Sequence, residues 1–141
     1  MQLNNNPMAL NSRNKGAAAE RDVAKLLFDQ LGVKLKRNLE QTRSGGHDLI
    51  SDEVGLLDAY AIEIKRYAKV THALVERFWD QACRQAEAVG KTPVLIFRGD
   101  REDWRVALPL SLLFEKVFDS QTSSEFGIFS FHAFCTLMRE W

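Results

Sequence analysis

Three charged side chains stand out in the stretch TRSGGHDLISDEVGLLDAYAIEIKR, residues 42–66. Asp48 follows a Gly-Gly pair, and Glu63 and Lys65 lie two residues apart within an alternation of apolar residues. Because alternate residues of a strand share one face, Glu63 and Lys65 should point the same way. Two carboxylates on neighbouring strands can hold Mg²⁺, and a lysine beside them can orient a water and neutralise charge. The pattern indicates a divalent-metal site; the alternative is a weak ion pair on the outer face of a half-buried strand.

A third carboxylate, Glu20, lies on an apolar stripe of the first predicted helix. The stripe follows the i, i+3, i+4, i+7 spacing of one helix face: Glu20, Val23, Ala24, Leu27, Phe28 and Leu31. A buried carboxylate without a partner costs several kcal/mol, and a metal or a neighbouring lysine would remove that cost. We therefore expect Glu20 to face the same site as Asp48.

The elements that position these residues follow from hydrophobic periodicity and turn residues. Residues 1–12 are Asn-rich and are predicted to form a flexible arm, and residues 13–141 to form one domain. The chain then predicts a helix over 15–31, strands over 33–38, 47–51 and 56–66 in an antiparallel meander, a helix over 71–89 capped by Thr71, strands over 92–98 and 103–109, and a helix over 110–118. The tail from residue 126 is ambiguous between strand and helix. This αβββαββα order predicts an α/β fold in which helices flank a mixed sheet.

Composition and charge limit the class of protein. The chain is 45% apolar and 27% charged, as in a soluble globular domain, and no apolar run approaches the roughly 20 residues that span a bilayer. Cys83 and Cys135 lie far apart and are predicted to be free, buried thiols in a reducing compartment. We therefore expect a cytoplasmic protein with no membrane partner. The net charge is zero, but residues 1–47 carry eight Lys and Arg against four acids, so this segment could offer a basic face to a polyanion or form an ordinary solvated surface.

Four segments of the chain together resemble the PD-(D/E)xK nuclease superfamily, with HD in place of PD. They are RNKGAAAERDVAKLL, RSGGHDLI, AIEIKR and QACRQAEAVGKTPVLIFR, which occur in the superfamily's order. The chain is most similar to Holliday junction resolvases of the archaeal type, whose first helix opens with a similar basic-Gly-x-x-x-Glu-Arg pattern. The resemblance covers roughly residues 13 to 110 and implies a restriction-endonuclease-like fold and Mg²⁺-dependent hydrolysis of phosphodiesters.

The resemblance also implies roles for single residues. Asp48 and Glu63 would be direct metal ligands, with the Ile64 carbonyl a further candidate, and Glu20 would bind the metal through water or complete its shell. Lys65 would position the nucleophilic water, and Ser44 matches a catalytically assisting serine of the resolvases. The expected DNA contacts are Arg13, Lys15 and Arg43 to phosphates, and Gln81 and Arg98 along the same cleft, with a structural role as the alternative for these last two.

The hypothesis from sequence is a Mg²⁺-dependent DNA endonuclease, with Mn²⁺ able to substitute, that resolves four-way (Holliday) junctions or other branched DNA. Because cutting two opposed strands calls for two-fold symmetry, a homodimer is expected. The Phe-rich tail could form the dimer interface or cap the monomer's own core. The alternatives are a restriction- or repair-type nuclease on linear duplex DNA, and a non-catalytic nucleic-acid-binding module on the same fold.

Overall fold

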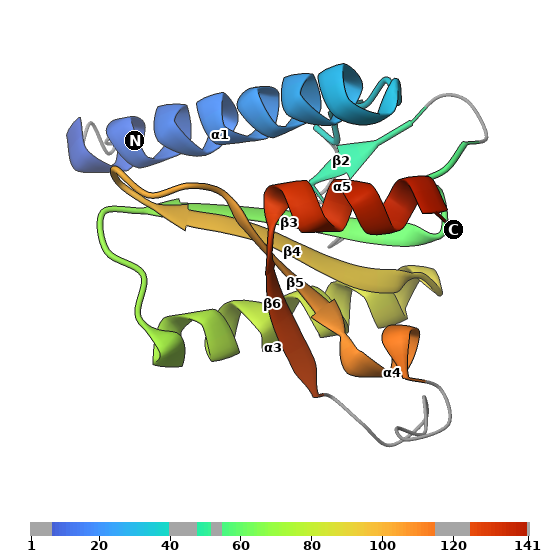
Figure 1. Cartoon of the computed structure of the whole chain (residues 1–141). Coiled ribbons are helices and arrows are strands. Elements are labelled where there is room, and N and C mark those ends of the chain that lie inside the picture. Colours follow the sequence, from blue (N-terminus) through green and yellow to red (C-terminus); the bar gives the residue numbers. More distant parts are fainter. Residues whose placement is uncertain (1–6, 40–47, 52–54, 115–124, 141) are drawn as a thin grey trace.

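The computed structural model describes residues 7–39, 48–51, 55–114 and 125–140, with side chains from residue 16 onward. A mixed sheet forms the centre of the molecule, and helices cover both of its faces (Figure 1). The helices α1 (Pro7–Leu31) and α5 (Phe131–Glu140) lie on one face, and α3 (His72–Val89) lies on the other, on the same side as the short α4 (Leu110–Leu113). The predicted fold class is confirmed.

The sheet contains six strands among the described residues, and their order in the sheet is their order in the sequence. They are β1 (Lys36–Arg37), β2 (Leu49–Ile50), β3 (Tyr60–Tyr67), β4 (Thr92–Gly99), β5 (Arg105–Pro109) and β6 (Phe126–Ser130). β3 and β4 are parallel, and every other neighbouring pair is antiparallel. Parallel neighbours need a long crossover, and α3 supplies it. The antiparallel pairs β1–β2 and β2–β3 confirm the predicted meander of the first three strands.

Local signals fix the two ends of α3. The Thr71 side chain accepts a hydrogen bond from the Leu74 N–H at 3.2 Å, which satisfies one of the unpaired donors of the first turn. Gly90 ends the helix with φ 66°, a left-handed conformation that glycine adopts without a side-chain clash. Both ends lie where the sequence predicted them. No helix in the described residues is long and apolar enough to cross a membrane.

The sheet separates two hydrophobic cores. The α1 and α5 face buries a core that includes Val23, Leu27, Ile62, Ile96 and Phe134. The α3 face buries a second core that includes Val75, Phe78, Trp79, Leu95 and Phe97. Successive residues of β3 and β4 alternate between these cores, as strand geometry requires. Any side chain on β3 can therefore be assigned to one face or the other.

The structure differs from the sequence prediction at both ends of the chain. The first helix begins at Pro7 rather than Lys15, so residues 7–12, predicted as part of an arm, have helical backbone. The ambiguous tail forms both alternatives in turn, because β6 pairs with β5 and α5 follows it directly. The Ser130 hydroxyl accepts a hydrogen bond from the Ala133 N–H at 3.0 Å, as expected of a cap. The observed order is thus longer than αβββαββα by one strand and one helix.

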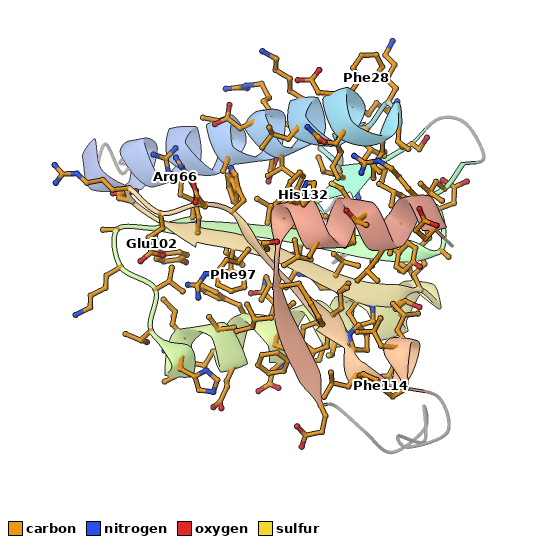
Figure 2. The ribbon with its side chains drawn as sticks, in the orientation of Figure 1. Phe28, Arg66, Phe97, Glu102, Phe114 and His132 are labelled. Carbon is orange, nitrogen blue, oxygen red and sulfur yellow. The ribbon has the colours of Figure 1, made fainter. Side chains whose placement is uncertain are left out.

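Two large apolar helix residues are exposed, one of which, Phe28, was predicted on the apolar stripe of the first helix. Phe28 is 53% exposed and points away from the sheet on the outer side of α1 (Figure 2), and Val89 is 42% exposed at the end of α3. The third strand begins at Tyr60 rather than Leu56, because residues 56–59 form a turn in which the Tyr60 N–H bonds the Leu57 carbonyl. The helix predicted over 110–118 ends at Leu113, and residues 115–118 lie outside the described residues.

Candidate active site

Asp48 lies where the pairing of β2 with β3 ends. Its N–H donates to the Ile62 carbonyl at 2.9 Å, and its Oδ2 accepts a hydrogen bond from the Ile64 N–H at 2.6 Å. Asp48 is 4% exposed, so this bond holds a buried carboxylate at a fixed position on the edge of β3.

Glu63 and Lys65 lie on the α3 face of β3. Their neighbours Ile62 and Ile64 belong to the core under α1, so alternation directs Glu63 and Lys65 to the opposite face, as predicted. The Lys65 Nζ lies 3.4 Å from Oε1 of Glu63. Asp48 shares this face, because its neighbour Leu49 also packs into the core under α1. The structure thus brings Asp48, Glu63 and Lys65 together.

The two buried carboxylates raise the energy of each other's charged form. Glu63 is 3% exposed, and loss of hydration together with the negative charge of Asp48 raises its pKa to about 8, although Lys65 acts in the opposite direction. Glu63 Oε2 is buried and accepts no hydrogen bond from the described residues. Lys65 therefore does not fully compensate the buried charge of Glu63.

This arrangement fits a divalent cation. Asp48 and Glu63 supply carboxylate oxygens, and the buried Oε2 of Glu63 has no hydrogen-bond partner among the described residues. Mg²⁺ prefers oxygen donors of this kind, usually with one or two carboxylates in the site. The backbone adds another donor, because the N–H and C=O of one strand residue point to the same side. The Ile64 carbonyl therefore faces the edge at which its N–H meets Asp48. No third acidic, histidine or cysteine side chain joins the group within the described ranges.

Glu20 is the main correction to the predicted site. Its Oε2 accepts a hydrogen bond from the Arg37 Nε at 2.6 Å, and the Glu20 side chain is only 12% exposed. Arg37 lies opposite Leu49 in the β1–β2 pair, so the ion pair is on the α1 side of the sheet. The partner expected for the buried Glu20 carboxylate was a metal or a lysine, and the partner found is an arginine. The helical stripe correctly predicted that Glu20 is buried but not which face of the sheet it meets.

For Arg98 the structure favours the structural alternative. Its register partner on β3 is Arg66, and both belong to the set of residues that faces α1 rather than α3. The Arg98 guanidinium lies 5.2 Å from the Trp104 ring centre and does not line the cleft with Lys65. Figure 2 shows the two faces: Arg66 points toward α1, and Phe97 lies on the α3 side.

Gln81 lies where the sequence analysis expected it. An open groove of about 550 Å³ runs along α3 beside the C-terminal half of β3, and both Lys65 and Gln81 line it. Arg13 and Lys15 lie in the helical backbone of α1, and their side chains are outside the described part. Arg43, Ser44 and His47 also lie outside the described residues.

Several residues that contact Glu20, contact Lys65 or line the groove were not predicted from the sequence. Arg37 pairs with Glu20, Phe78 places its ring centre 5.5 Å from the Lys65 Nζ, and Arg77 and Arg84 line the groove with Gln81. The spacing 77, 81, 84 is the i, i+4, i+7 pattern of one helix face, so a polar stripe beside the apolar one was a usable signal. No comparable signal identified Arg37, because it lies in a strand of two residues.

The described histidines, tryptophans and cysteines lie apart from the group formed by Asp48, Glu63 and Lys65. His72 and His132 are exposed and lie on different helices, and Trp79 is buried beneath α3. Trp104 packs against the core under α1, and Trp141 lies outside the described residues. Cys135 is buried and Cys83 is partly buried, and both are free. Burial raises the pKa of the Cys83 thiol to about 11, as expected of an unreactive thiol.

Comparison with known proteins identifies the family. A family model described as "Phage putative PDDEXK endonuclease" matches residues 11–138, a range that contains Asp48, Glu63 and Lys65. Protein D14 of Escherichia phage T5 is 30% identical over 119 residues, covering 74% of each chain. Among solved structures, the chain is similar to Hjc, a Holliday junction resolvase of the archaeal hyperthermophile Archaeoglobus fulgidus, with a TM-score of 0.42 and 21% identity over 65% of this chain and 70% of that chain. By its match over nearly the whole sequence, the chain belongs to the phage PD-(D/E)xK endonuclease family.

Proposed function

We propose that this protein hydrolyses phosphodiester bonds in DNA at the group formed by Asp48, Glu63 and Lys65. The observation that carries the proposal is the convergence of these three side chains on one face of the sheet, in a chain of an endonuclease family. In the reaction, a water oxygen attacks the phosphorus and the bond from phosphorus to one sugar oxygen breaks. The products are one end with a phosphate and one end with a hydroxyl group.

Asp48 and Glu63 would hold a divalent cation, Mg²⁺ or in its place Mn²⁺, with the Ile64 carbonyl as a further ligand. When bound, this cation would supply Lewis-acid stabilisation of the negative charge that develops on the phosphate oxygens. The Asp48–Ile64 hydrogen bond fixes one carboxylate before any ligand arrives, so less ordering is needed on binding. Positive charge close to Glu63 would favour its ionised form and lower its pKa from about 8.

Lys65 would position the attacking water and neutralise charge in the transition state. Its ammonium group lies 3.4 Å from Glu63, and the side chain is 20% exposed, so it remains open to the groove. The Phe78 ring beneath it limits the positions that the lysine can take. A positioned cation of this kind contributes on the order of 10²–10³ to the rate.

The substrate that we propose is a four-way junction or other branched DNA, cut by a homodimer. Support comes from the order of motifs, which resembles that of archaeal-type resolvases, and from the excess of basic residues in positions 1–47. Recognition of branched DNA would depend on backbone charge and shape, since phosphate contacts position a protein without reading bases. Two active sites related by two-fold symmetry would place matched nicks on opposed strands.

The test compares four labelled substrates with the purified protein: a four-way junction, linear duplex, single-stranded DNA and RNA, each with Mg²⁺ and with EDTA. Symmetric nicks in the junction, with little cutting of the duplex, would support the resolvase. Equal cutting of linear duplex would remove the junction preference and favour a restriction- or repair-type nuclease. Binding without cutting in any metal would favour a non-catalytic module.

Two variants test the residues. Asp48→Asn keeps an oxygen that can accept the Ile64 N–H while removing the negative charge, so cleavage should be lost and the fold retained. Lys65→Ala should lower the cleavage rate on the order of 10²–10³-fold with folding unchanged. Matched controls are Glu87→Gln and Lys25→Ala, which change exposed charges outside this group. Wild-type rates in Asp48→Asn would contradict the assignment.

A further inference from the structure

The groove beside α3 has a basic lining that continues from the proposed active site. Lys65 lies at one wall, and α3 contributes Arg77, Gln81 and Arg84. Asp80 is the acidic residue among those that line it, so positive charges exceed negative ones by three to one. An open groove with this balance favours an anionic ligand.

Both arginines on α3 are available to a ligand. Within the part of the chain that the structure describes, neither guanidinium forms an ion pair or a side-chain hydrogen bond. Three other arginines have partners: Arg37 pairs with Glu20, Arg66 with Asp100, and Arg139 bonds the Gln30 carbonyl. Arg77 and Arg84 are exposed, so they line the groove without a partner of their own.

The spacing of these arginines along α3 lets the two side chains contact different phosphates of one DNA strand. Seven residues of helix separate Arg77 from Arg84 by about 10 Å along the axis, so the two side chains can extend to separate phosphates. One DNA strand carries a phosphate at every nucleotide, so a strand that lies along α3 would bring several phosphates past the two arginines. Gln81 lies between them and can donate to the same backbone.

The wall of the groove suits the sugars and bases of such a strand. Tyr67 is 45% exposed, and its ring lies 5.0 Å from the Phe78 ring that also contacts Lys65. The tyrosine is thus fixed at the end of β3, two residues from the proposed catalytic lysine. A strand that passed the arginines would continue across this ring toward Lys65.

We propose that this groove binds the backbone of the DNA strand beside the bond that is cut, with Arg77 and Arg84 each contacting one of its phosphates. The inference rests on the proposed nuclease function and adds the path of the strand. Arg77 and Arg84 act in binding, and the chemical step stays with Asp48, Glu63 and Lys65. The groove therefore determines affinity and its dependence on salt.

The first experiment measures binding of labelled DNA in EDTA over a series of salt concentrations. Arg77→Ala and Arg84→Ala should each weaken binding roughly fivefold to tenfold and lower the slope of log K against log salt by about 0.9. Lys25→Ala is the matched control, because it removes one exposed charge from α1 on the other face of the sheet. Thermal unfolding checks that each variant is folded. Slopes equal to the wild type in both arginine variants would overturn the inference.

The second experiment locates each contact on the DNA. Single phosphates near the cleaved bond are replaced one at a time by neutral methylphosphonates. At the phosphate that Arg77 contacts, the replacement should weaken wild-type binding and have no further effect on Arg77→Ala, and the same should hold for Arg84 at a different phosphate. If each methylphosphonate weakened binding by an arginine variant as much as it weakens binding by the wild type, neither arginine would contact these phosphates.

The outcomes separate this inference from the proposed function. Wild-type protein that cuts DNA, with arginine variants that bind and cut like it, would refute the groove and leave the nuclease. Wild-type protein that neither binds nor cuts any DNA would refute both. Weaker binding by the arginine variants, with an unchanged rate at saturating protein, would support both.

Discussion

Replacement of Glu63 by glutamine should stabilise the metal-free protein above neutral pH. Folding raises the pKa of Glu63 from 4.5 to about 8, so the folded state binds a proton that the unfolded state has lost. A group with a raised pKa contributes its full stability below pH 4.5 and loses it as the pH rises through about 8. Glutamine carries no charge and does not pay this cost.

The size of the effect follows from the two pKa values. At 1.36 kcal/mol for each unit, the wild type should lose about 5 kcal/mol from this site by pH 9, of which about 3 kcal/mol is lost by pH 7. Asp48 and Glu63 interact, so this loss belongs to the pair rather than to one residue. The difference in unfolding free energy between Glu63→Gln and wild type should therefore grow with pH in this window.

Urea denaturation in EDTA at pH 5, 7 and 9 measures this difference. Glu87→Gln, an exposed acid on α3, is the control and should follow the wild-type curve. Millimolar Mg²⁺ should stabilise the wild type by mass action and leave Glu63→Gln nearly unchanged. Parallel pH curves for wild type and Glu63→Gln would refute the reasoning, because they would mean that the buried pair carries no electrostatic cost.

Three further predictions concern stability, each measured by urea denaturation. Arg37→Ala should cost about 1–3 kcal/mol because it leaves the buried Glu20 unpaired, whereas Arg66→Ala, whose ion pair is partly exposed, should cost about 0–1 kcal/mol; equal losses would contradict the difference in burial. Thr71→Ala should cost about 1 kcal/mol through loss of the helix cap, and the argument fails if Thr71→Ser costs as much. Phe134→Ala should cost about 3–5 kcal/mol because the ring is fully buried between α5 and the sheet, and a loss below about 1 kcal/mol would show that this core is loosely packed.

The secondary structure could be predicted wherever the apolar residues of a segment clearly followed the repeat of a strand or of a helix. The alternation of β3 and the capped stripe of α3 gave the correct elements, because each signal is local. The segment from Phe126 is apolar without a clear period, and its structure depends on pairing with β5 and packing beside α1. Those contacts join residues far apart in sequence, so local reasoning could not decide between strand and helix.

The site was predictable to the extent that strand geometry defines it. Alternation placed Glu63 and Lys65 on one face, and the hairpin from Asp48 placed a second acid beside them. Glu20 shows the limit of this reasoning: its helix stripe indicates burial, but only the assembled sheet shows that Arg37 meets it from β1. Arg98 shows the same limit, because its face depends on register with β3.

The contact between α1 and α5 has a consequence for how the chain folds during synthesis. Arg139 donates to the carbonyl and side-chain oxygens of Gln30, 109 residues earlier, and the buried Phe134 and Met138 complete the core beneath α1. A nascent chain would therefore keep part of the apolar face of α1 uncovered until α5 leaves the ribosome. Such distant contacts slow folding and lengthen the exposure of apolar surface.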